Sequence, residues 1–401
     1  MNKNQFILLV VVAVVIGGIG YSLRSKQQAS WTQSAAKMGD KVIENLDVNK
    51  VEAMTIKSPS GSISLAKKGD IWTVQERSDY PANFGSIHDF LIKAMELKVG
   101  QPVKASAGQL GRLELSAPDK GTNGGTLVEL KDSSGKSLHT IVLGKKVMRE
   151  GGASASPFGG GGGGFPVGRY IMVGNDPKNV SIVSEAFASI EPKAGDWLDK
   201  DFLKVEKLKT ISVSAEEATN SWKAVRETEN AEWALADAKG EEKFDTSKVS
   251  GFNYLLNSPS FADVVASDKK AEDTGLDKPS TAVLTTFDGF TYTVKLGKTD
   301  AEGRQYAQFA VAAEIPKERA AGPDEKPEDK EKLDKEFKEK TGKLQEKLKK
   351  EQFHDKWVYL FDKWSVDNLL KKRHELLAEK KAEEPKKEGE SSEASPLPKL
   401  D

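Results

Sequence analysis

LHTIVLGK at residues 138–145 returns with its skeleton intact as TYTVKLGK at residues 291–298. Both stretches alternate apolar and polar side chains, which is typical of a β-strand with one buried face. The second copy continues into Thr299 and so ends in GKT, the ending of a phosphate-binding loop. That loop requires another glycine five positions before Gly297, and this position holds Tyr292. The repeat therefore indicates a duplicated strand and not a nucleotide site.

Other landmarks repeat in the same order around this strand. The matched pairs, first copy before second, are 48–56 with 205–213, Trp72 with Trp233, a predicted helix at 87–99 with one at 249–261, L-x-x-P at 115–118 with 276–279, and 168–173 with 303–311. A fixed order of landmarks at slowly drifting offsets indicates an internal duplication. We expect two homologous mixed α+β domains rich in β-hairpins, each with a helix packed on its sheet. Both tryptophans are expected to be core anchors.

The chain of 401 residues is long enough for two domains of ordinary size. We predict a transmembrane signal anchor at 1–23, a stalk at 24–45, a first repeat domain at 46–203, a second repeat domain at 204–377 and a disordered tail at 378–401. The tail is rich in Lys, Glu, Ser and Pro and has almost nothing to bury.

The amino-terminal segment belongs to a different class of sequence. Residues 6–23 carry no charge, and as a helix they would be about 27 Å long, close to the hydrocarbon thickness of a bilayer. A cleaved signal peptide is the alternative, although the residues that follow fit an A-x-A-like cleavage site poorly. The short head before the apolar run favours an orientation with the two domains outside the cytoplasm.

The first copy contains a glycine loop, at residues 151–168. Six consecutive glycines at 159–164 lie between Phe158 and Phe165. Such a run cannot hold one backbone conformation, so we expect a mobile loop. Either it presents Phe158 and Phe165 to a partner or a membrane, or it is a neutral expansion.

The second copy contains a charged helical insertion, at residues 315–353. Its apolar positions are spaced as a narrow helical stripe: Leu333, Phe337, Leu344 and Leu348. The stripe either leans on its own domain or docks onto another protein. These four residues, with the two phenylalanines of the glycine loop, are the candidate partner-contact residues.

Several classes of chemistry lack the residues they need. There is no cysteine, and the four histidines do not stand at a metal-ligand spacing such as i and i+4. Lys and Arg total 60 against 61 Asp and Glu, so no global basic field would attract nucleic acid. G-x-S-x-G is absent. We therefore predict no enzyme, no catalytic, cofactor-binding or metal-binding residue, and neither nucleic acid nor nucleotide as a partner.

Taken together, the landmarks resemble the bacterial family known as domain of unknown function 4340. The matching motifs are the opening strand at 48–51, Trp72, the GL-x-x-P motif at 275–279, the strand that ends in LGK at 289–298 and the W-L-D-K segment at 197–200. The resemblance covers roughly residues 46–375 in two copies. The first copy lacks the GL pair before Pro118, and the second departs by its charged insertion.

Members of that family look like envelope proteins, often encoded beside an ABC transporter of the gliding-motility type, and the resemblance carries over no catalytic residues. It implies a single-pass protein of the bacterial cytoplasmic membrane with extracytoplasmic tandem domains, an accessory or scaffold beside membrane-protein subunits of a transporter-like complex. A binding module for peptide or glycan, with Trp72, Trp233 or the glycine loop lining a groove, is the alternative. An unrecognised hydrolase is a third possibility.

Overall fold

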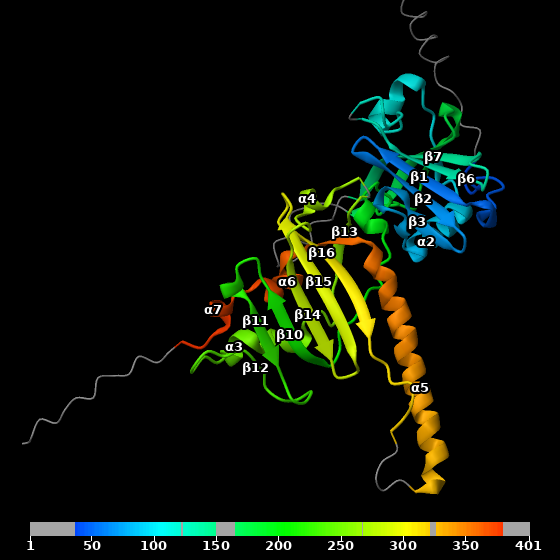
Figure 1. The fold of residues 1–401 in the computed structure, drawn as a ribbon. Coiled ribbons are helices and arrows are strands. Elements are labelled where there is room, and N and C mark those ends of the chain that lie inside the picture. The colour runs from blue at the N-terminus through cyan, green and yellow to red at the C-terminus, as the bar shows by residue number, and fades with distance from the viewer. Residues whose placement is uncertain (1–36, 122, 150–164, 267, 321–325, 380–401) are drawn as a thin grey trace, which may run out of the picture.

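Two large antiparallel β-sheets dominate the computed structural model, one in each lobe (Figure 1). The structure describes residues 37–121, 123–149, 165–266, 268–320 and 326–379. The predicted anchor at 1–23 lies outside these residues, as do Phe158 and nearly all of the predicted tail. Across the described part of the chain, no helix combines the length and the apolar character needed to cross a membrane.

The first sheet has the strand order β4-β3-β2-β1-β6-β7-β8-β9-β5. Its strands are β1 (Ala53–Ser58), β2 (Gly61–Lys68), β3 (Ile71–Val74), β4 (Tyr80–Pro81), β5 (Gln101–Pro102), β6 (Thr126–Lys131), β7 (Ser137–Arg149), β8 (Phe165–Val173) and β9 (Val180–Val183). Burial alternates strictly along β6, as a period-two sequence requires when one face of the sheet meets the main core.

The second sheet has the order β12-β11-β10-β14-β15-β16-β17-β13. Its strands are β10 (Leu208–Ser214), β11 (Trp222–Val225), β12 (Ala234–Leu235), β13 (Phe261–Val264), β14 (Ser280–Thr286), β15 (Phe290–Thr299), β16 (Arg304–Ala313) and β17 (Val358–Asp362). Apart from β4, which is added at one edge, the two orders coincide strand for strand. This coincidence supports the duplication inferred from the repeated landmarks.

The two LGK motifs end up at the same irregularity of the two sheets. In the first, the pairing of β7 with β8 shifts register between Leu143 and Lys146; in the second, the pairing of β15 with β16 shifts between Leu296 and Thr299. A shift of this kind is a β-bulge, which bends the strand and increases its twist. The motif that identified the repeat therefore marks a conformational feature that both sheets share.

The predicted α+β class is wrong, because within the described residues helices are few and mostly short. The α-helices are α2 (Phe84–Glu96), α3 (Thr246–Val249), α4 (Ala271–Thr274), α5 (Pro327–Gln352), α6 (Lys363–Leu370) and α7 (Arg373–Leu376). The 3₁₀ helices are η1 (Val48–Lys50), η2 (Gln75–Arg77), η3 (Ala107–Leu113), η4 (Pro177–Asn179), η5 (Ala194–Trp197), η6 (Ala218–Asn220), η7 (Ser250–Tyr254) and η8 (Phe353–Lys356). The chain is mostly β-sheet.

The error is clearest where the second copy was expected to repeat the helix of the first. In the first copy, α2 buries Ile87, Phe90 and Leu91 against the sheet, as predicted. The second copy has only α3 followed by η7, and then irregular chain. Gly251, Asn253 and Pro259 are poor helix formers, and tertiary packing of Phe252 replaces the regular helix.

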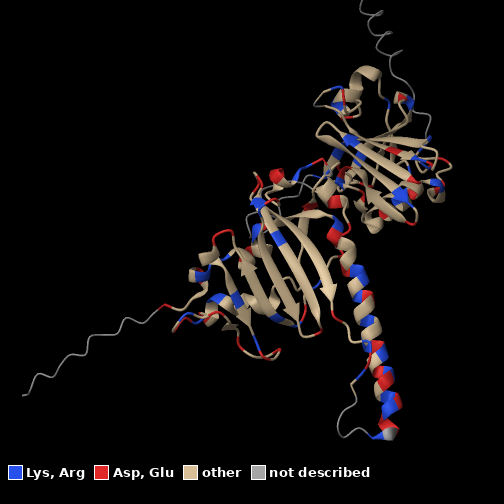
Figure 2. Ribbon diagram, in the orientation of Figure 1, with Lys and Arg blue, Asp and Glu red and all other residues tan. Residues whose placement is uncertain are grey.

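The insertion of the second copy forms the long helix α5, which extends from the junction of the lobes (Figure 1). Basic and acidic residues alternate along it, whereas the strands are mostly uncharged (Figure 2). Its carboxyl-terminal half packs against the main core through Leu344 and Leu348, and Asp334 in its amino-terminal half pairs with Arg319 of the preceding segment.

One continuous hydrophobic core serves both lobes. At the junction, the ring of Tyr80 on β4 makes edge contacts with Phe261, Trp357 and Tyr359 of the second lobe, at centroid distances of 5.6, 4.9 and 5.9 Å. Trp72 and Trp233 are both buried, as predicted. Edge-to-face aromatic contacts add to the burial of apolar area, so the junction is packed like a domain interior.

Candidate functional site

Of the six predicted partner-contact residues, the five that the structure describes do not form one surface. Phe165 begins β8 of the first sheet and is 81% exposed. The four stripe residues lie on α5 in the second lobe. Phe158 lies outside the described residues. Leu344 and Leu348 contribute to the core, and Leu333 and Phe337 are half-buried nearer the free end of α5.

The glycine of each LGK motif permits a close approach between two backbone segments. A Cβ atom on Gly144 would overlap the carbonyl oxygen of Leu113, and one on Gly297 would overlap the carbonyl oxygen of Thr274. Leu113 precedes the first L-x-x-P motif, and Thr274 precedes the GL pair of the second. The two short motifs recur together because they touch, and only glycine leaves room for the contact.

A buried polar side chain holds each of these glycines. Arg169, 7% exposed, donates from Nε to the carbonyl oxygen of Gly144 at 2.7 Å. Gln305, 3% exposed, donates from Nε2 to the carbonyl oxygen of Gly297 at 2.7 Å. Strand register places these two residues at equivalent positions, opposite Lys146 and Thr299. Both side chains satisfy a carbonyl that the bulge removes from the regular ladder.

The junction between the lobes carries a specific ion pair as well as apolar contacts. Arg77 donates from Nε and Nη2 to the two carboxylate oxygens of Asp263, at 2.7 and 2.8 Å. This bond to Asp263 raises the pKa of Arg77. Trp357 donates from Nε1 to the carbonyl oxygen of Ser78 at 3.1 Å. Two-point guanidinium binding fixes an angle as well as a distance, so the junction has a defined geometry.

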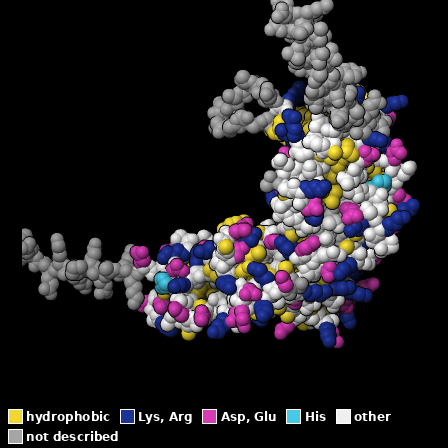
Figure 3. Space-filling model, turned by 90° about the horizontal axis from the view of Figure 1, so that it is seen from above, with side chains coloured by type: hydrophobic (Ala, Val, Ile, Leu, Met, Phe, Trp, Pro, Cys, Tyr) yellow, Lys and Arg dark blue, Asp and Glu magenta, His cyan; other side chains and the backbone are white. Residues whose placement is uncertain are grey.

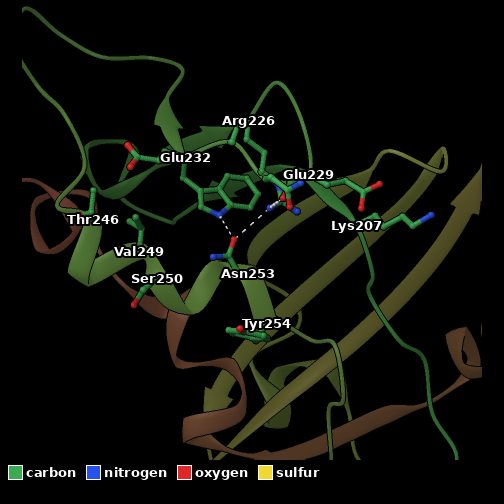
Figure 4. Close-up of a pocket in the computed structure, with 12 residues that line it drawn as sticks. Lys207, Arg226, Glu229, Glu232, Thr246, Val249, Ser250, Asn253 and Tyr254 are labelled. Atoms are coloured by element: carbon green, nitrogen blue, oxygen red, sulfur yellow. Dashed lines mark hydrogen bonds between the residues drawn. The ribbon is translucent and has the colours of Figure 1, made fainter.

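A pocket of about 540 Å³ lies on the second lobe beside Trp233 (Figure 4). The guanidinium of Arg226 stacks over the Trp233 ring, 4.7 Å from its centroid. Asn253 Oδ1 accepts hydrogen bonds from Trp233 Nε1 at 3.0 Å and from Arg226 at 3.3 Å. Burial lowers the pKa of Arg226. These contacts hold the three side chains in one orientation.

The open wall of this pocket combines an aromatic ring with polar groups. Tyr254 is 76% exposed. In Figure 4, Asn253 lies between Glu232 on one side and the pair Glu229 and Lys207 on the other. Because Asn253 uses its oxygen for Trp233 and Arg226, its Nδ2 donor has no protein partner among the described residues. An exposed ring beside amide and carboxylate groups suits a ligand with both apolar faces and hydrogen-bonding groups. The lining residues come mainly from two short segments, 226–233 and 246–254, and apart from Trp233 no sequence signal singled them out.

A second polar cluster anchors α5. The buried carboxylate of Glu351 accepts from the backbone N–H of Lys204 at 2.9 Å and from the hydroxyl of Tyr292 at 2.8 Å. Burial raises the pKa of Glu351. One turn later, burial lowers the pKa of His354 to about 4. The cluster ties the end of α5 to the sheet, so its evident role is structural.

Metal chemistry has no support in the described part of the chain, where no group of three or more His, Cys, Asp or Glu residues is arranged to hold an ion. The visible face of the molecule carries acidic and basic side chains interspersed over both lobes (Figure 3). A mixed surface of this kind gives no long-range field of one sign.

Comparison with known proteins matches the chain to a protein family. A family model described as a domain of unknown function (DUF4340) matches residues 72–279, from the tryptophan of the first copy to the proline motif of the second. No curated protein and no solved structure matches the chain.

Proposed function

We propose that this chain, which belongs to the family described as domain of unknown function DUF4340, is a non-enzymatic scaffold. Its two lobes would hold a protein partner in a fixed geometry. The observation that carries this proposal is the junction. A shared core and the two-point contact between Arg77 and Asp263 set the angle between the lobes. A scaffold requires such a fixed angle, because a flexible linkage would lose binding free energy to ordering.

The resemblance adds a finer proposal, that the partner is a membrane subunit of an ABC-transporter-like envelope complex. We further propose that the lobes lie outside the cytoplasm and that the uncharged residues 6–23 attach the chain to the membrane. Protease treatment of intact spheroplasts tests this location. Digestion of the lobes before lysis would support it, and protection until lysis would contradict it.

Crosslinking in the native host, followed by mass spectrometry, tests the scaffold itself. We expect membrane transport subunits to crosslink repeatedly to both lobes, and their absence across replicates would contradict the proposal. Asp263→Arg should loosen the junction and change the angle between the lobes, because it places a like charge beside Arg77. Simultaneous crosslinks from both lobes to one partner should then be lost. Asp288→Arg is the matched control, since it reverses an aspartate that pairs with Lys207 away from the junction.

The pocket beside Trp233 favours a second candidate function, the binding of a peptide or glycan. Tyr254→Ala should abolish binding on peptide or glycan arrays, while Tyr254→Phe should retain ring stacking. Trp364→Ala is the control, because Trp364 is 74% exposed on α6 and does not line this pocket. Equal array signals for all the variants would remove this candidate.

A further inference from the structure

A second pocket, of about 420 Å³, opens beside the LGK bulge of the first sheet. It lies between the segment that contains η3 and strands β7 and β8. Its charged lining is entirely basic and consists of Lys104, Arg112, Lys145 and Lys146. In a chain whose basic and acidic residues are nearly equal in number, four cations around one pocket with no carboxylate in its lining are a local concentration of charge.

These cations are not engaged elsewhere. Among the described residues, none of the four makes an ion pair or a side-chain hydrogen bond with another part of the protein. The pKa of Glu191 is lowered mainly by its ion pair with Lys193, at 2.8 Å, and only to a smaller extent by the charge of Lys146. The positive charge of the pocket therefore remains available to a ligand.

A fifth positive charge, that of Arg169, lies next to the LGK bulge, opposite Lys146 in the strand register. The guanidinium of Arg169 is buried and donates to main-chain carbonyl oxygens only, including those of Gly144 and Phe187. Burial lowers its pKa, yet an arginine stays protonated at neutral pH. Within the described part of the chain, no carboxylate binds Arg169 directly, and Glu114 and Glu191 act on its charge only from beyond ion-pair distance. A buried cation is costly, so an anion bound nearby would add to its stabilisation.

The equivalent pocket of the second sheet has the opposite property. It holds about 540 Å³ and is lined by Arg77, Lys269, Lys298 and Arg304, but also by Asp263, Asp273, Asp300 and Glu302. Two of its cations are neutralised directly, since Arg77 binds Asp263 and Arg304 binds Asp300 at 2.8 Å. The pocket beside the LGK bulge is therefore basic in the first sheet, whereas in the second sheet its positive charges are balanced by carboxylates.

The remaining walls of the basic pocket define the rest of the ligand. Val103, Leu113 and Val147 contribute apolar surface, and the ring of Tyr170 forms part of the wall. A satellite hydrophobic cluster on this face of the sheet supports them. The volume lies within the range of small-molecule sites, so the pocket holds more than a bare inorganic ion.

We propose that this pocket binds a phosphate ester, with the phosphate against the four cations and an organic part against the apolar wall. A negatively charged phosphate group with several acceptor oxygens suits the fork of Arg112 and three lysine ammonium groups. The phosphate belongs either to a soluble ester or to a lipid headgroup. Beyond the pocket, the described ends of β7 and β8 expose Met148, Phe165 and Val167, which would face the apolar part of a lipid.

The test uses the purified full chain in a non-ionic detergent. Glycerol 3-phosphate binding is measured by calorimetry, and retention of phosphatidylglycerol against phosphatidylcholine is measured by native mass spectrometry. Replacing Lys145 and Lys146 together by Gln should weaken binding by roughly tenfold or more. Replacing both by Arg should keep binding. Lys298→Gln, in the neutral pocket, is the matched control and should leave binding unchanged.

The outcomes identify the source of the phosphate. Binding of glycerol 3-phosphate supports a soluble ester, and selective retention of phosphatidylglycerol alone supports a lipid headgroup. Failure of the wild-type chain to bind either probe overturns the proposal. So does equal binding by the wild type and the Gln double variant. Equal retention of the two lipids also overturns it when glycerol 3-phosphate fails to bind, because charge would then play no part. Thermal unfolding of each variant separates lost binding from lost folding.

Discussion

In the first sheet a guanidinium, that of Arg169, donates to the carbonyl of the LGK glycine, whereas in the second sheet the neutral carboxamide of Gln305 makes the equivalent bond. Both bonds span 2.7 Å, and both side chains are buried. A single N–H donor is therefore sufficient to hold the bulge. Arg169 also donates to the carbonyl oxygens of Ala186 and Phe187, and it lies opposite Lys146, one of the cations that line the basic pocket.

The surroundings of the two glycines differ in the same way. In the second lobe the cations near the motif are matched by carboxylates, and one of these pairs, Arg77 with Asp263, joins the lobes. In the first lobe the cations have no such partners among the described residues. The cations near the motif therefore take part in the junction between the lobes in the second copy, whereas in the first copy they line an open basic pocket.

The largest expected effect concerns the framework that both sheets share. Gly144→Ala and Gly297→Ala should each lower the free energy of unfolding by about 3 to 4 kcal/mol, because the new Cβ overlaps a backbone carbonyl oxygen that cannot move independently. Denaturant unfolding measures the change. Gly342→Ala, within α5 and with open space around it, is the control and should stabilise by up to about 1 kcal/mol. A cost below about 1 kcal/mol at both strand glycines would contradict the close approach.

A pH response should belong to the second lobe. His354 is buried, and its pKa falls from 6.5 to about 4, so the unfolded chain binds the proton more tightly. This contribution to stability is present above pH 6.5 and is lost as the pH falls toward 4. The loss amounts to about 3 kcal/mol. His354→Phe should flatten this part of the pH profile in denaturant titrations. An unchanged slope in the variant would assign the response to other groups.

Exchanging the two glycine-holding side chains sharpens the comparison. Arg169→Ala should destabilise by about 2 to 3 kcal/mol, because buried carbonyl oxygens, including those of Gly144 and Phe187, lose their donor. Arg169→Gln should cost about half as much, since the amide can make the bond that Gln305 makes. Equal costs in denaturant unfolding would show that Arg169 does not act through the carbonyl of Gly144.

The smallest effect concerns the junction. A double-mutant cycle with Arg77→Ala and Asp263→Ala should give a coupling energy of about 1 to 2 kcal/mol, because the pair is two-point and partly buried. The same cycle at Lys207 and Asp288, a more exposed pair, should give less than about 1 kcal/mol. The reverse order would indicate that apolar contacts alone hold the lobes together.

Part of this architecture was predictable from local patterns. The repeated LGK strand, the buried Trp72 and Trp233, and the helix α2 all follow from periodicity that neighbouring residues carry. The expected helix at 249–261 failed because packing of Phe252 against Trp222 and Trp233 overrode a weak helical pattern. The resulting class is mostly β.

The candidate sites were less predictable. Lys145 and Lys146 are neighbours in the sequence, but Lys104 and Arg112 join them only because the η3 segment approaches Gly144. Likewise, the hydrogen bond between Asn253 and Trp233 depends on how η7 packs, and no regular spacing of residues in the sequence predicts it.

The sequence by itself determined that the unit is duplicated, which strands correspond and where the copies diverge, because these are properties of residue order and period. Only the tertiary structure decided which charges are neutralised. Pairing of ions depends on distances of a few ångströms between residues remote along the chain, and those distances are set by the bulge, the glycine contact and the junction.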